Sequence, residues 1–451
     1  MPINHNSWRR ALIGNPLRRA RDWSDSQDEP ASEQQAAPAP ESQQPGEPPL
    51  APSRRSLRGL DWFVFFVADV QTGFGPFVSV YLTSQRWTQV DIGLALSAAG
   101  FVSLVGQMPG GALVDAARSE RFVGAIAVAA ICISALAYAA FPIFPVVLSA
   151  SILHAMASCV LGPAIAAISL GLVGHAAIGA RLGRNARFAS VGNGLAAAAM
   201  GAIGYLVSAR AVFIVTVLLL GPALLVLRLI SPTEIDAERA HGSPPPRRKK
   251  PAIKPGELMR NRPLLIFAGC LLLFHLANAA MLPLMGSVLT MRSSSNWATI
   301  LIAACIVVPQ MVVAAFSPWV GNRAQTWGRR PLLLIGFAAL PIRGLLFAVV
   351  GNPVLLVAVQ LFDGITAAVF AVMVPLVVAD LTRNTGHFNL GQGIVGTCVG
   401  IGAAISATLA GFLSDRYGSP WAFAGLAMVA LAGLATVYLL MPETKPAEES
   451  G

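Results

Sequence analysis

The chain has 451 residues, of which 55% are hydrophobic and 12% are charged, and its mean hydropathy is +0.63. This composition excludes an ordinary soluble globular protein and is typical of a chain that crosses a membrane many times. The formal net charge is +10, but no basic face interleaved with aromatic residues is found, which argues against a nucleic-acid partner.

The first 57 residues differ from the rest of the chain. They contain several arginines and then a tract rich in Pro, Gln, Glu and Ala. Such a tract cannot bury enough apolar surface to fold alone, so we predict a disordered cytoplasmic tail at 1–57. The alternative is a short amphipathic turn, built on Trp8 and Leu12, that lies on the inner leaflet.

Twelve long apolar stretches follow, and a helix needs about 20 apolar residues to cross a bilayer. The first six predicted spans are 61–84, 88–115, 122–141, 143–174, 185–208 and 211–230. The second six are 263–291, 297–322, 330–350, 353–381, 390–414 and 420–441. We therefore predict an all-α integral membrane protein with an N-terminal half (58–230), a central cytoplasmic loop (231–262), a C-terminal half (263–441) and a cytoplasmic tail (442–451).

Lysine and arginine predict the orientation of these spans. Of the 32 Lys and Arg, 27 fall on the side shared by both termini and the central loop, and one, Arg343, lies inside a span. The remaining four are Arg86, Arg210, Arg292 and Arg416. The positive-inside rule places the basic side in the cytoplasm. Short loops and Ala- and Gly-rich spans favour a bacterial inner membrane.

The two halves repeat each other with an offset of about 207–210 residues. Gln71 in the first span aligns with Asn278 in the seventh, and His154 in the fourth aligns with Asp363 in the tenth. Each half has an even number of predicted spans, so both enter the membrane in the same direction. Parallel repeats of this kind form a substrate site at their interface, near the middle of the bilayer.

Two loops contain matching motifs. Between spans 2 and 3 the chain reads Gly111-Ala112-Leu113-Val114-Asp115, followed by Arg118 and Arg121. Between spans 8 and 9 the counterpart ends in Gly328-Arg329-Arg330, with Gln325 at the place of the acid. With these motifs and the repeat, residues 60–441 resemble the major facilitator superfamily. The resemblance implies a twelve-helix carrier that works by alternating access.

The loop motifs predict a gate on the cytoplasmic side. Asp115 ends a helix there, and its predicted partner is Arg181, Arg184 or Arg187, in the loop before span 5. Such a pair would hold the inside closed and break when the halves move. The predicted gate also includes Gly111, Arg118, Arg121, Gly328, Arg329 and Arg330. For the arginines, the alternative is a charge that only sets topology.

Ionisable side chains inside the predicted spans are candidates for function, because each costs about 2.5–3.5 kcal/mol to insert. Asp69 in span 1 is the first proton-coupling candidate, since a carboxyl group in apolar surroundings can load and release a proton. The resemblance also implies such an acid in exporters. The alternative is a buried polar anchor.

Three more side chains are proton-coupling candidates: Asp363, His275 and His154. Asp363 and Arg343 lie on successive spans and are equally consistent with a structural ion pair, and for each histidine the alternative is an interhelical hydrogen bond. Candidates for binding substrate are Gln71, Asn278, Gln310 and Arg343.

Soluble-enzyme motifs do not compete with this interpretation. No phosphate-cradling loop, serine elbow or metal-type His/Cys cluster is found, so we predict no enzyme activity, no cofactor and no metal. Two features that the resemblance leads us to expect in proton antiporters are missing. Ser151 stands at the place of an arginine in span 4, and span 5 lacks a Gly-Pro pair.

The predicted function is secondary active transport of a small molecule, and proton-coupled efflux by antiport is the first choice. The expected partners are a small-molecule substrate, protons and the lipid bilayer, and we expect a monomer. One alternative is an importer that takes up an organic anion or nutrient by proton symport. An alternative of another class is a membrane receptor or assembly factor that transports nothing.

Overall fold

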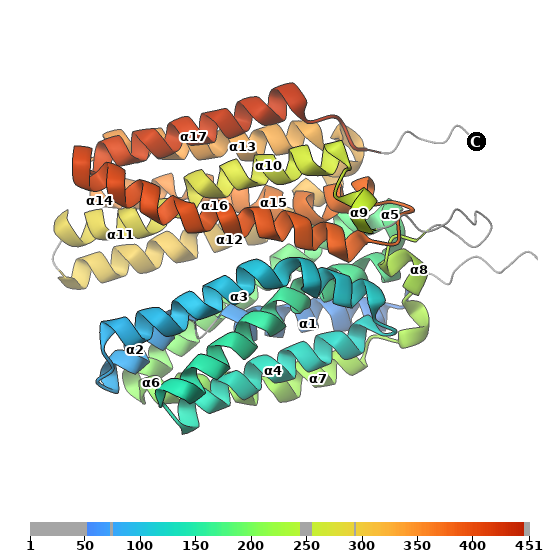
Figure 1. The fold of residues 1–451 in the computed structure, drawn as a ribbon, viewed down its shortest axis with the longest axis horizontal. Coiled ribbons are helices and arrows are strands. Elements are labelled where there is room, and N and C mark those ends of the chain that lie inside the picture. Colours follow the sequence, from blue (N-terminus) through green and yellow to red (C-terminus); the bar gives the residue numbers. More distant parts are fainter. Residues whose placement is uncertain (1–51, 73–74, 244–254, 293–294, 446–451) are drawn as a thin grey trace, which may run out of the picture. The chain divides into compact units, whose positions relative to one another are not determined.

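Helices make up almost all of the chain that can be described (Figure 1). The computed structural model describes residues 52–72, 75–243, 255–292 and 295–445, and no strand occurs within these ranges. Most of the predicted tail at 1–57, and the basic run after Pro246, lie outside them. All the described helices belong to one unit, residues 50–451.

The N-terminal half contains seven helical elements. They are α1 (Arg54–Thr72), α2 (Gly75–Ser84), α3 (Gln89–Ala116), α4 (Glu120–Ala140), α5 (Phe144–Leu206), α6 (Ala209–Leu218) and α7 (Leu220–Arg228). At 63 residues, α5 would be about 95 Å long if straight, three times the thickness of a bilayer core. It turns at Gly174, whose φ of 66° and ψ of 177° are not helical. The two limbs of α5 correspond to the predicted fourth and fifth spans.

The central loop and the C-terminal half continue the chain. The loop holds η1 (Pro232–Glu234), α8 (Ala237–Ala240) and α9 (Pro255–Leu258). The half contains α10 (Arg262–Asn278), α11 (Met281–Arg292), α12 (Ser295–Trp327), α13 (Arg330–Val349), α14 (Pro353–Val359), α15 (Leu361–Leu381), α16 (Phe388–Tyr417) and α17 (Ser419–Leu440). The last helix ends within one residue of the predicted last span.

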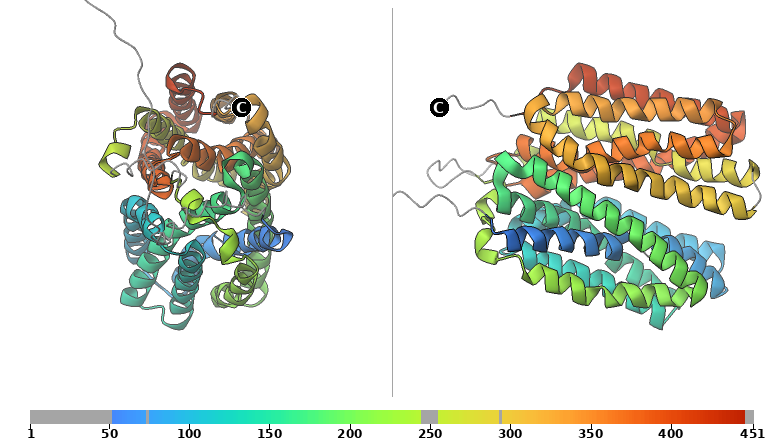
Figure 2. Two further views of the ribbon diagram at one scale, coloured as in Figure 1. Left: turned by 90° about the vertical axis from the view of Figure 1, so that its right-hand side faces the viewer. Right: turned by 180° about the vertical axis from the view of Figure 1, so that it is seen from behind.

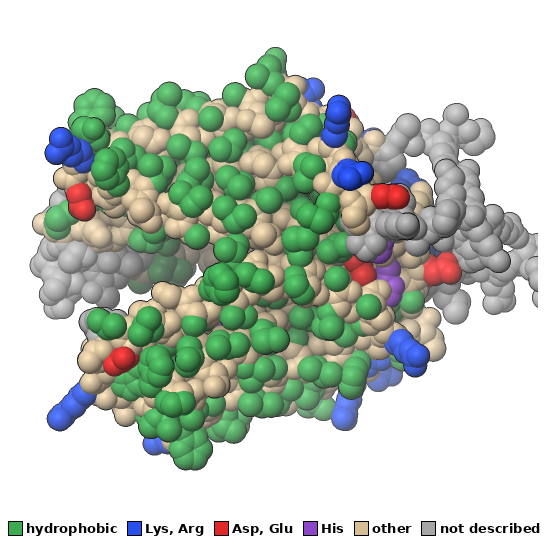
Figure 3. Space-filling model, in the orientation of Figure 1, with side chains coloured by type: hydrophobic (Ala, Val, Ile, Leu, Met, Phe, Trp, Pro, Cys, Tyr) green, Lys and Arg blue, Asp and Glu red, His purple; other side chains and the backbone are tan. Residues whose placement is uncertain are grey.

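Ten helices in the described ranges are long and apolar enough to cross a membrane. The two-limbed α5 counts once among them, and the predicted first span, α1 with α2, is not among them. Figure 3 shows the pattern a bilayer requires, because charged side chains gather at the two ends and apolar side chains cover the band between. The prediction of an all-α membrane fold is confirmed.

The helix boundaries repeat between the halves. α10 begins at Arg262, 208 positions after α1 begins at Arg54, and α13 begins at Arg330, 210 positions after α4 begins at Glu120. One apolar core lies wholly within the N-terminal half, and a second fills the C-terminal half and includes buried residues of α5. The repeat seen in the sequence is therefore a repeat of helical units.

The halves meet chiefly along α5 with α12 and α3 with α16, and α5 also contacts α15 and α16 (Figures 1 and 2). The end of the bundle that carries α8, α9 and residues 441–445 is called here the tail end. There the second limb of α5 crosses α12 so closely that a Cβ atom on Gly179 would lie 2.8 Å from the Gly321 carbonyl oxygen. Glycine at these positions permits the close backbone approach.

Candidate functional site

A cavity of about 400 Å³ lies between the two halves. α1, α3 and both limbs of α5 line one side, and α15 and α16 line the other. Its wall is apolar except for three carboxamides, Gln107, Asn185 and Gln392, and no charged side chain is among the described lining residues. The four predicted substrate-binding residues, Gln71, Asn278, Gln310 and Arg343, are not in this wall.

Two of the three carboxamide side chains, Gln107 and Gln392, have few hydrogen-bond partners within the described part of the protein. Gln107 Nε2 lies 3.6 Å from Cys159 Sγ, and its Oε1 faces Gly396, where a Cβ atom would come within 2.7 Å. The Gln392 side chain is half-buried and has no hydrogen-bond partner among the described residues. Both amides can therefore offer donors and acceptors to a ligand. Neither residue was predicted, because a neutral carboxamide in a span has no feature in the sequence that places it at the interface of the halves.

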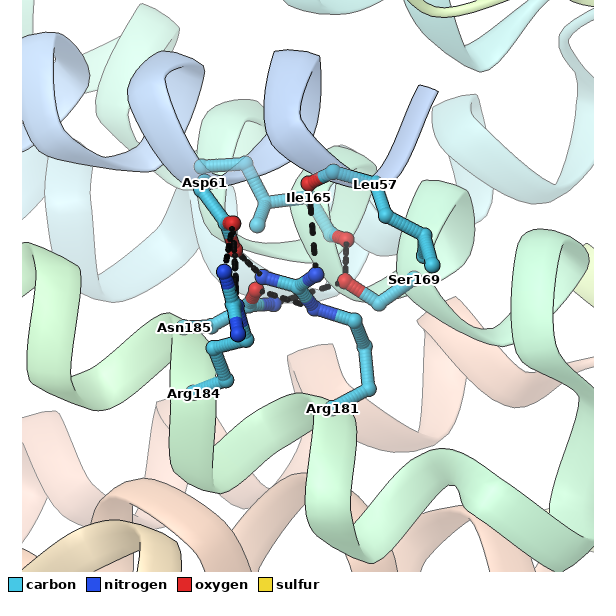
Figure 4. A network of polar contacts seen from close by, with 7 residues as sticks. All are labelled: Leu57, Asp61, Ile165, Ser169, Arg181, Arg184 and Asn185. Atoms are coloured by element: carbon cyan, nitrogen blue, oxygen red, sulfur yellow. Dashed lines mark hydrogen bonds and ion pairs between the residues drawn. The ribbon is translucent and has the colours of Figure 1, made fainter. Parts of the chain in front are cut away.

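Behind the cavity, Asp61 on α1 binds two arginines of the second limb of α5 (Figure 4). Arg184 donates from Nη2 to Asp61 Oδ2 at 2.6 Å and from Nε to both carboxylate oxygens at 2.9 Å. Arg181 donates from Nη2 to Asp61 Oδ1. The Asp61 and Arg181 side chains are 1% and 4% exposed. A buried carboxylate is thus fixed by one buried and one exposed guanidinium.

The same network reaches the cavity wall. Arg181 Nε donates to Asn185 Oδ1 at 2.8 Å, Asn185 Nδ2 donates to Ser169 Oγ at 2.8 Å, and Ser169 donates to the Ile165 carbonyl at 2.7 Å. Asn185 and Ile165 both line the cavity. The Asp61 network therefore fixes one wall of the cavity to α1 and to both limbs of α5.

A second charged cluster lies inside the C-terminal half. Arg343 on α13 is 2% exposed, pairs through Nη1 with Asp363 on α15, and donates from Nη2 to Asn278 Oδ1 on α10 at 2.5 Å. The ion pair that the sequence analysis gave as the alternative to transport roles for Arg343 and Asp363 is thus present in the structure, and their transport roles remain predictions. Because the cation is bound by two partners in its own half, it is not a free anion-binding group in this conformation.

The other predicted residues do not gather around the cavity. The side chain of Asp69 lies outside the described part of the structure. Gln71 on α1, His154 on the first limb of α5, His275 on α10 and Gln310 on α12 are each half-buried and do not line the cavity. Their predicted roles remain predictions.

At the tail end, Asp115 connects the halves through the start of α16. Its Oδ1 accepts from the backbone N–H of Asn389 at 3.1 Å and from Asn389 Nδ2 at 2.8 Å, and its Oδ2 accepts from the Leu390 N–H at 2.7 Å. The first N–H groups of a helix lack intrahelical acceptors and carry partial positive charge, so a carboxylate is stabilised there.

The predicted partner of Asp115 was an arginine, and that prediction is wrong. Arg181 and Arg184 bind Asp61 within the N-terminal half, and Arg187 donates from Nε to the Ala314 carbonyl of α12 at 2.9 Å. A carboxylate can bind backbone N–H groups as well as a cation, and sequence spacing does not show which helix terminus lies opposite. Gly111 permits this contact, because a Cβ atom there would overlap the Asn389 backbone.

The remaining predicted gate residues form contacts within one half or are exposed. Arg118 is exposed, and Arg121 donates to the Leu227 carbonyl at 3.2 Å. Arg329 binds Asp380 of α15, with Nε 2.7 Å from Oδ2. The backbone N–H groups after Gly328, those of Arg329 and Arg330, donate to Glu443 at 2.8 and 3.0 Å. These contacts hold the C-terminal half together at the tail end.

Glu443 has a titration behaviour that reflects these contacts. Burial raises its pKa, but the backbone N–H groups of Arg329, Lys445, Arg330 and Thr444 outweigh burial, so the pKa lies below its ordinary value of 4.5. The carboxylate is therefore charged over the physiological pH range.

The first part of the central loop is packed at the tail end. Ala240 is buried, Asn389 Nδ2 donates to its carbonyl at 3.4 Å, and the Phe388 N–H donates to the His241 carbonyl at 3.1 Å. His241 Nε2 lies 3.0 Å from Glu120 Oε1 at the start of α4. The described part of this loop thus contacts both halves.

The pKa of His241 predicts a pH effect. The hydrogen bond to Glu120 raises this pKa above its ordinary value of 6.5, burial lowers it, and the charges of Glu120 and Asp115 raise it further. A raised pKa in the folded state stabilises the fold fully below 6.5, and this stabilisation is lost as pH rises through the raised value. We expect His241→Gln to lower the melting temperature at mildly acidic pH and to have little effect at alkaline pH.

Melting curves of the purified protein, recorded from mildly acidic to alkaline pH, would measure the effect. Glu120→Gln should remove the same pH-dependent component, whereas Glu257→Gln, at an exposed acid of α9, should leave it intact. If His241→Gln lowered the melting temperature equally at every pH, the ion-pair interpretation would be contradicted.

Comparison with known proteins identifies the family. A sequence profile described as Major Facilitator Superfamily matches residues 62–321 and 287–451, which together include nearly all the described helices. The chain belongs to the major facilitator superfamily. Members of this superfamily are secondary transporters of small molecules, so the chain is a multi-pass membrane transporter of this family.

Relatives and solved structures agree with this assignment. Uncharacterized MFS-type transporters of Mycobacterium tuberculosis, strains H37Rv and CDC 1551, are 40% identical over 400 residues, which is 86% of this chain and 94% of each relative. The human organic anion transporter MFSD10 has a TM-score of 0.63 at 15% identity, covering 85% of this chain and 99% of that one.

A further solved structure is the fucose:proton symporter FucP. A single-residue variant of the Escherichia coli protein has a TM-score of 0.64 at 17% identity, covering 85% of this chain and 97% of that one. FucP in its outward conformation has a TM-score of 0.64 at 16% identity. At these identities the likeness shows the superfamily fold alone.

Proposed function

We propose that this superfamily member exports a small, uncharged, amphipathic molecule in exchange for protons, from a bacterial inner membrane with both termini in the cytoplasm. The observation that carries the proposal is the cavity between the halves, which is lined by apolar groups and carboxamides, together with the contact of Asp115 with α16 that joins the halves at the tail end. In a carrier that works by alternating access, a closed inside leaves the site open to the outside.

The contacts at the tail end support a conformation that is closed on the cytoplasmic side. Asp115, Arg187 and the crossing of Gly179 with Gly321 all join the halves at that end. Toward the opposite end, formed by α2 and α11, Figure 3 shows a hollow between the halves. Opening the tail end requires these contacts to break together, which makes it a two-state step.

The cavity wall supports an uncharged substrate. An ion in such a cavity would lose its hydration without gaining a charged partner from the described wall, which is unfavourable. Gln107 and Gln392 supply hydrogen bonds to a neutral polar group, and the apolar wall binds the rest of the molecule. No cation that would favour an organic anion is among the described lining residues. Arg343 lies outside this wall and is bound by Asp363 and Asn278.

For proton coupling we propose Asp69 first and Asp363 second, with His154 and His275 after them. Asp363 is 27% exposed and is neutralised by Arg343. Protonation of Asp363 would release Arg343 from one partner and so connect proton binding to the packing of α10, α13 and α15. The argument for Asp69 is its place in the first span, where an acid in apolar surroundings can load and release a proton.

Reconstitution tests this function. The protein would be placed in liposomes with a trapped pH dye, and pooled uncharged drugs and metabolites, with organic anions as a separate pool, would be screened for substrate-triggered proton flux. We expect flux with the uncharged pool and at least a tenfold loss in Asp69→Asn, as for removal of a general acid or base.

The exposed acid Asp415 supplies the control, because it stands near the end of α16 and does not line the cavity, so Asp415→Asn should leave the flux unchanged. Flux that survives in Asp69→Asn but is lost in Asp363→Asn would move the coupling site to Asp363. Transport of a labelled compound without a pH change would exclude proton coupling, and a response to organic anions alone would overturn the proposed substrate class.

A further inference from the structure

A second cavity, of about 360 Å³, lies at the tail end of the N-terminal half. It is formed between the beginning of α4 and the end of α7, and it shares no lining residue with the cavity between the halves. Two of its lining residues, Arg121 and Arg228, are cations, and no acidic side chain is among its described lining residues. It therefore has to be considered as a site in its own right.

The two arginines lack an anionic partner. Arg121 donates from Nη2 to the Leu227 carbonyl at 3.2 Å, but its Nε is buried and has no hydrogen-bond partner among the described residues. Arg228 is exposed, and neither arginine forms an ion pair with a described residue. The nearby Glu120 pairs with His241 instead. An anion placed between the arginines would supply the missing acceptor.

The walls of this cavity change character with depth. Ser119 and the arginines lie at the ends of α4 and α7, whereas Phe122, Ala125 and Leu224 follow toward the middle of the membrane. Phe122 is 66% exposed although it is a large apolar side chain. The cavity thus has a cationic rim at the membrane surface and an apolar wall that continues into the hydrocarbon region. A free phosphate would use only the rim.

We propose that this cavity binds an anionic phospholipid from the leaflet that faces the tail end. The phosphate group lies between Arg121 and Arg228, next to the N-terminus of α4, and one acyl chain lies along Phe122, Ala125 and Leu224. Both the arginines and the helix N-terminus favour a phosphate. The bound lipid holds α4 to α7 from outside, where Arg121 already caps the last turn of α7.

Native mass spectrometry of the purified full-length protein tests the proposal. The protein would be titrated with dioleoyl phosphatidylglycerol and, separately, with dioleoyl phosphatidylcholine. We expect one phosphatidylglycerol to be retained in preference to phosphatidylcholine. Arg121→Gln combined with Arg228→Gln should weaken this binding about 30-fold, because each arginine near the surface contributes to anionic-lipid binding.

The matched control removes two cations elsewhere at the tail end. Arg260→Gln combined with Arg323→Gln changes the net charge equally, at one exposed arginine of the central loop and one of the C-terminal half, and should retain the lipid. Equal loss in both double variants, or no preference for phosphatidylglycerol, would overturn the proposal. So would full displacement of the lipid by millimolar inorganic phosphate, which would identify a free anion as the ligand.

If the double variant fails to fold, the single variant Arg228→Gln tests the proposed lipid site. The Arg228 side chain is exposed and forms no hydrogen bond or ion pair with a described residue, so its removal should not disturb the fold. A weaker retention of phosphatidylglycerol in this variant supports the site, and an unchanged retention contradicts it. Phe122→Ser, which shortens the apolar wall, should weaken lipid binding while leaving both cations in place.

Discussion

Replacing Asp61 with Asn is expected to lower the free energy of unfolding by about 3–5 kcal/mol, because it leaves a buried arginine without its counter-charge. Arg181 is 4% exposed and has Asp61 as its ion-pair partner. Arg184 is 56% exposed and can be solvated by water or headgroups, so it adds little to this loss. Thermal or denaturant unfolding of the purified protein would measure the effect.

A double variant separates this explanation from a simple loss of packing. Asp61→Asn combined with Arg181→Met removes both buried charges, and replacing a buried ion pair with apolar groups is often neutral or stabilising. We therefore expect the double variant to recover most of the stability, as a mutant cycle would show. Asp415→Asn, at an exposed acid, should change little, and an unaffected Asp61→Asn would contradict the argument.

Replacing Asp115 with Asn is expected to open the tail end. The carboxylate accepts three hydrogen bonds from Asn389 and Leu390, and bonds to a charged acceptor contribute about 1.5–3 kcal/mol each. An amide at this position can accept fewer bonds and carries no charge for the helix N-terminus. We expect a loss of about 2–3 kcal/mol, which shifts the equilibrium between closed and open tail ends about 30- to 150-fold.

Spin labels on Arg118→Cys and Arg383→Cys, two exposed positions in different halves at the tail end, would report the change as a longer distance between labels. Four of the five native cysteines are buried, so only Cys398 needs replacement, by Ala. Asp415→Asn, at the other end of α16, serves as the matched control. A distance distribution that is the same in wild type and Asp115→Asn would show that this carboxylate does not hold the gate.

The fold could be predicted from the sequence because its signals are local. Each span is an apolar run that must form its backbone hydrogen bonds within itself in lipid, so length and hydropathy identify a helix without knowledge of its neighbours. The boundaries of α13 and α14–α15 accordingly lie within one residue of the predictions. For Arg343 and Asp363, their place on successive spans indicated an ion pair as one of two readings, and the structure contains that pair.

The sites depended on information that the sequence does not contain. Asp61 was not singled out, because it stands near the beginning of its span, where a charge can equally well face water. Its burial follows from the approach of α5 to α1. Gln107 and Gln392 are neutral, so no cost of inserting a charge into the membrane singles them out. They lie 285 positions apart, so their spacing does not show that they belong to one cavity wall.

The sequence by itself determined the membrane fold, the twofold repeat, the predicted orientation and the chemistry available at Asp115 and Arg343. Tertiary structure decided which partner each charge has: the N-terminus of α16 for Asp115, the Arg181–Arg184 pair for Asp61, and no described anion for Arg121 and Arg228. The physical reason is range. Helix formation in a bilayer is settled within each segment, whereas a charge is stabilised by whichever group the packing of distant helices brings within a few ångströms.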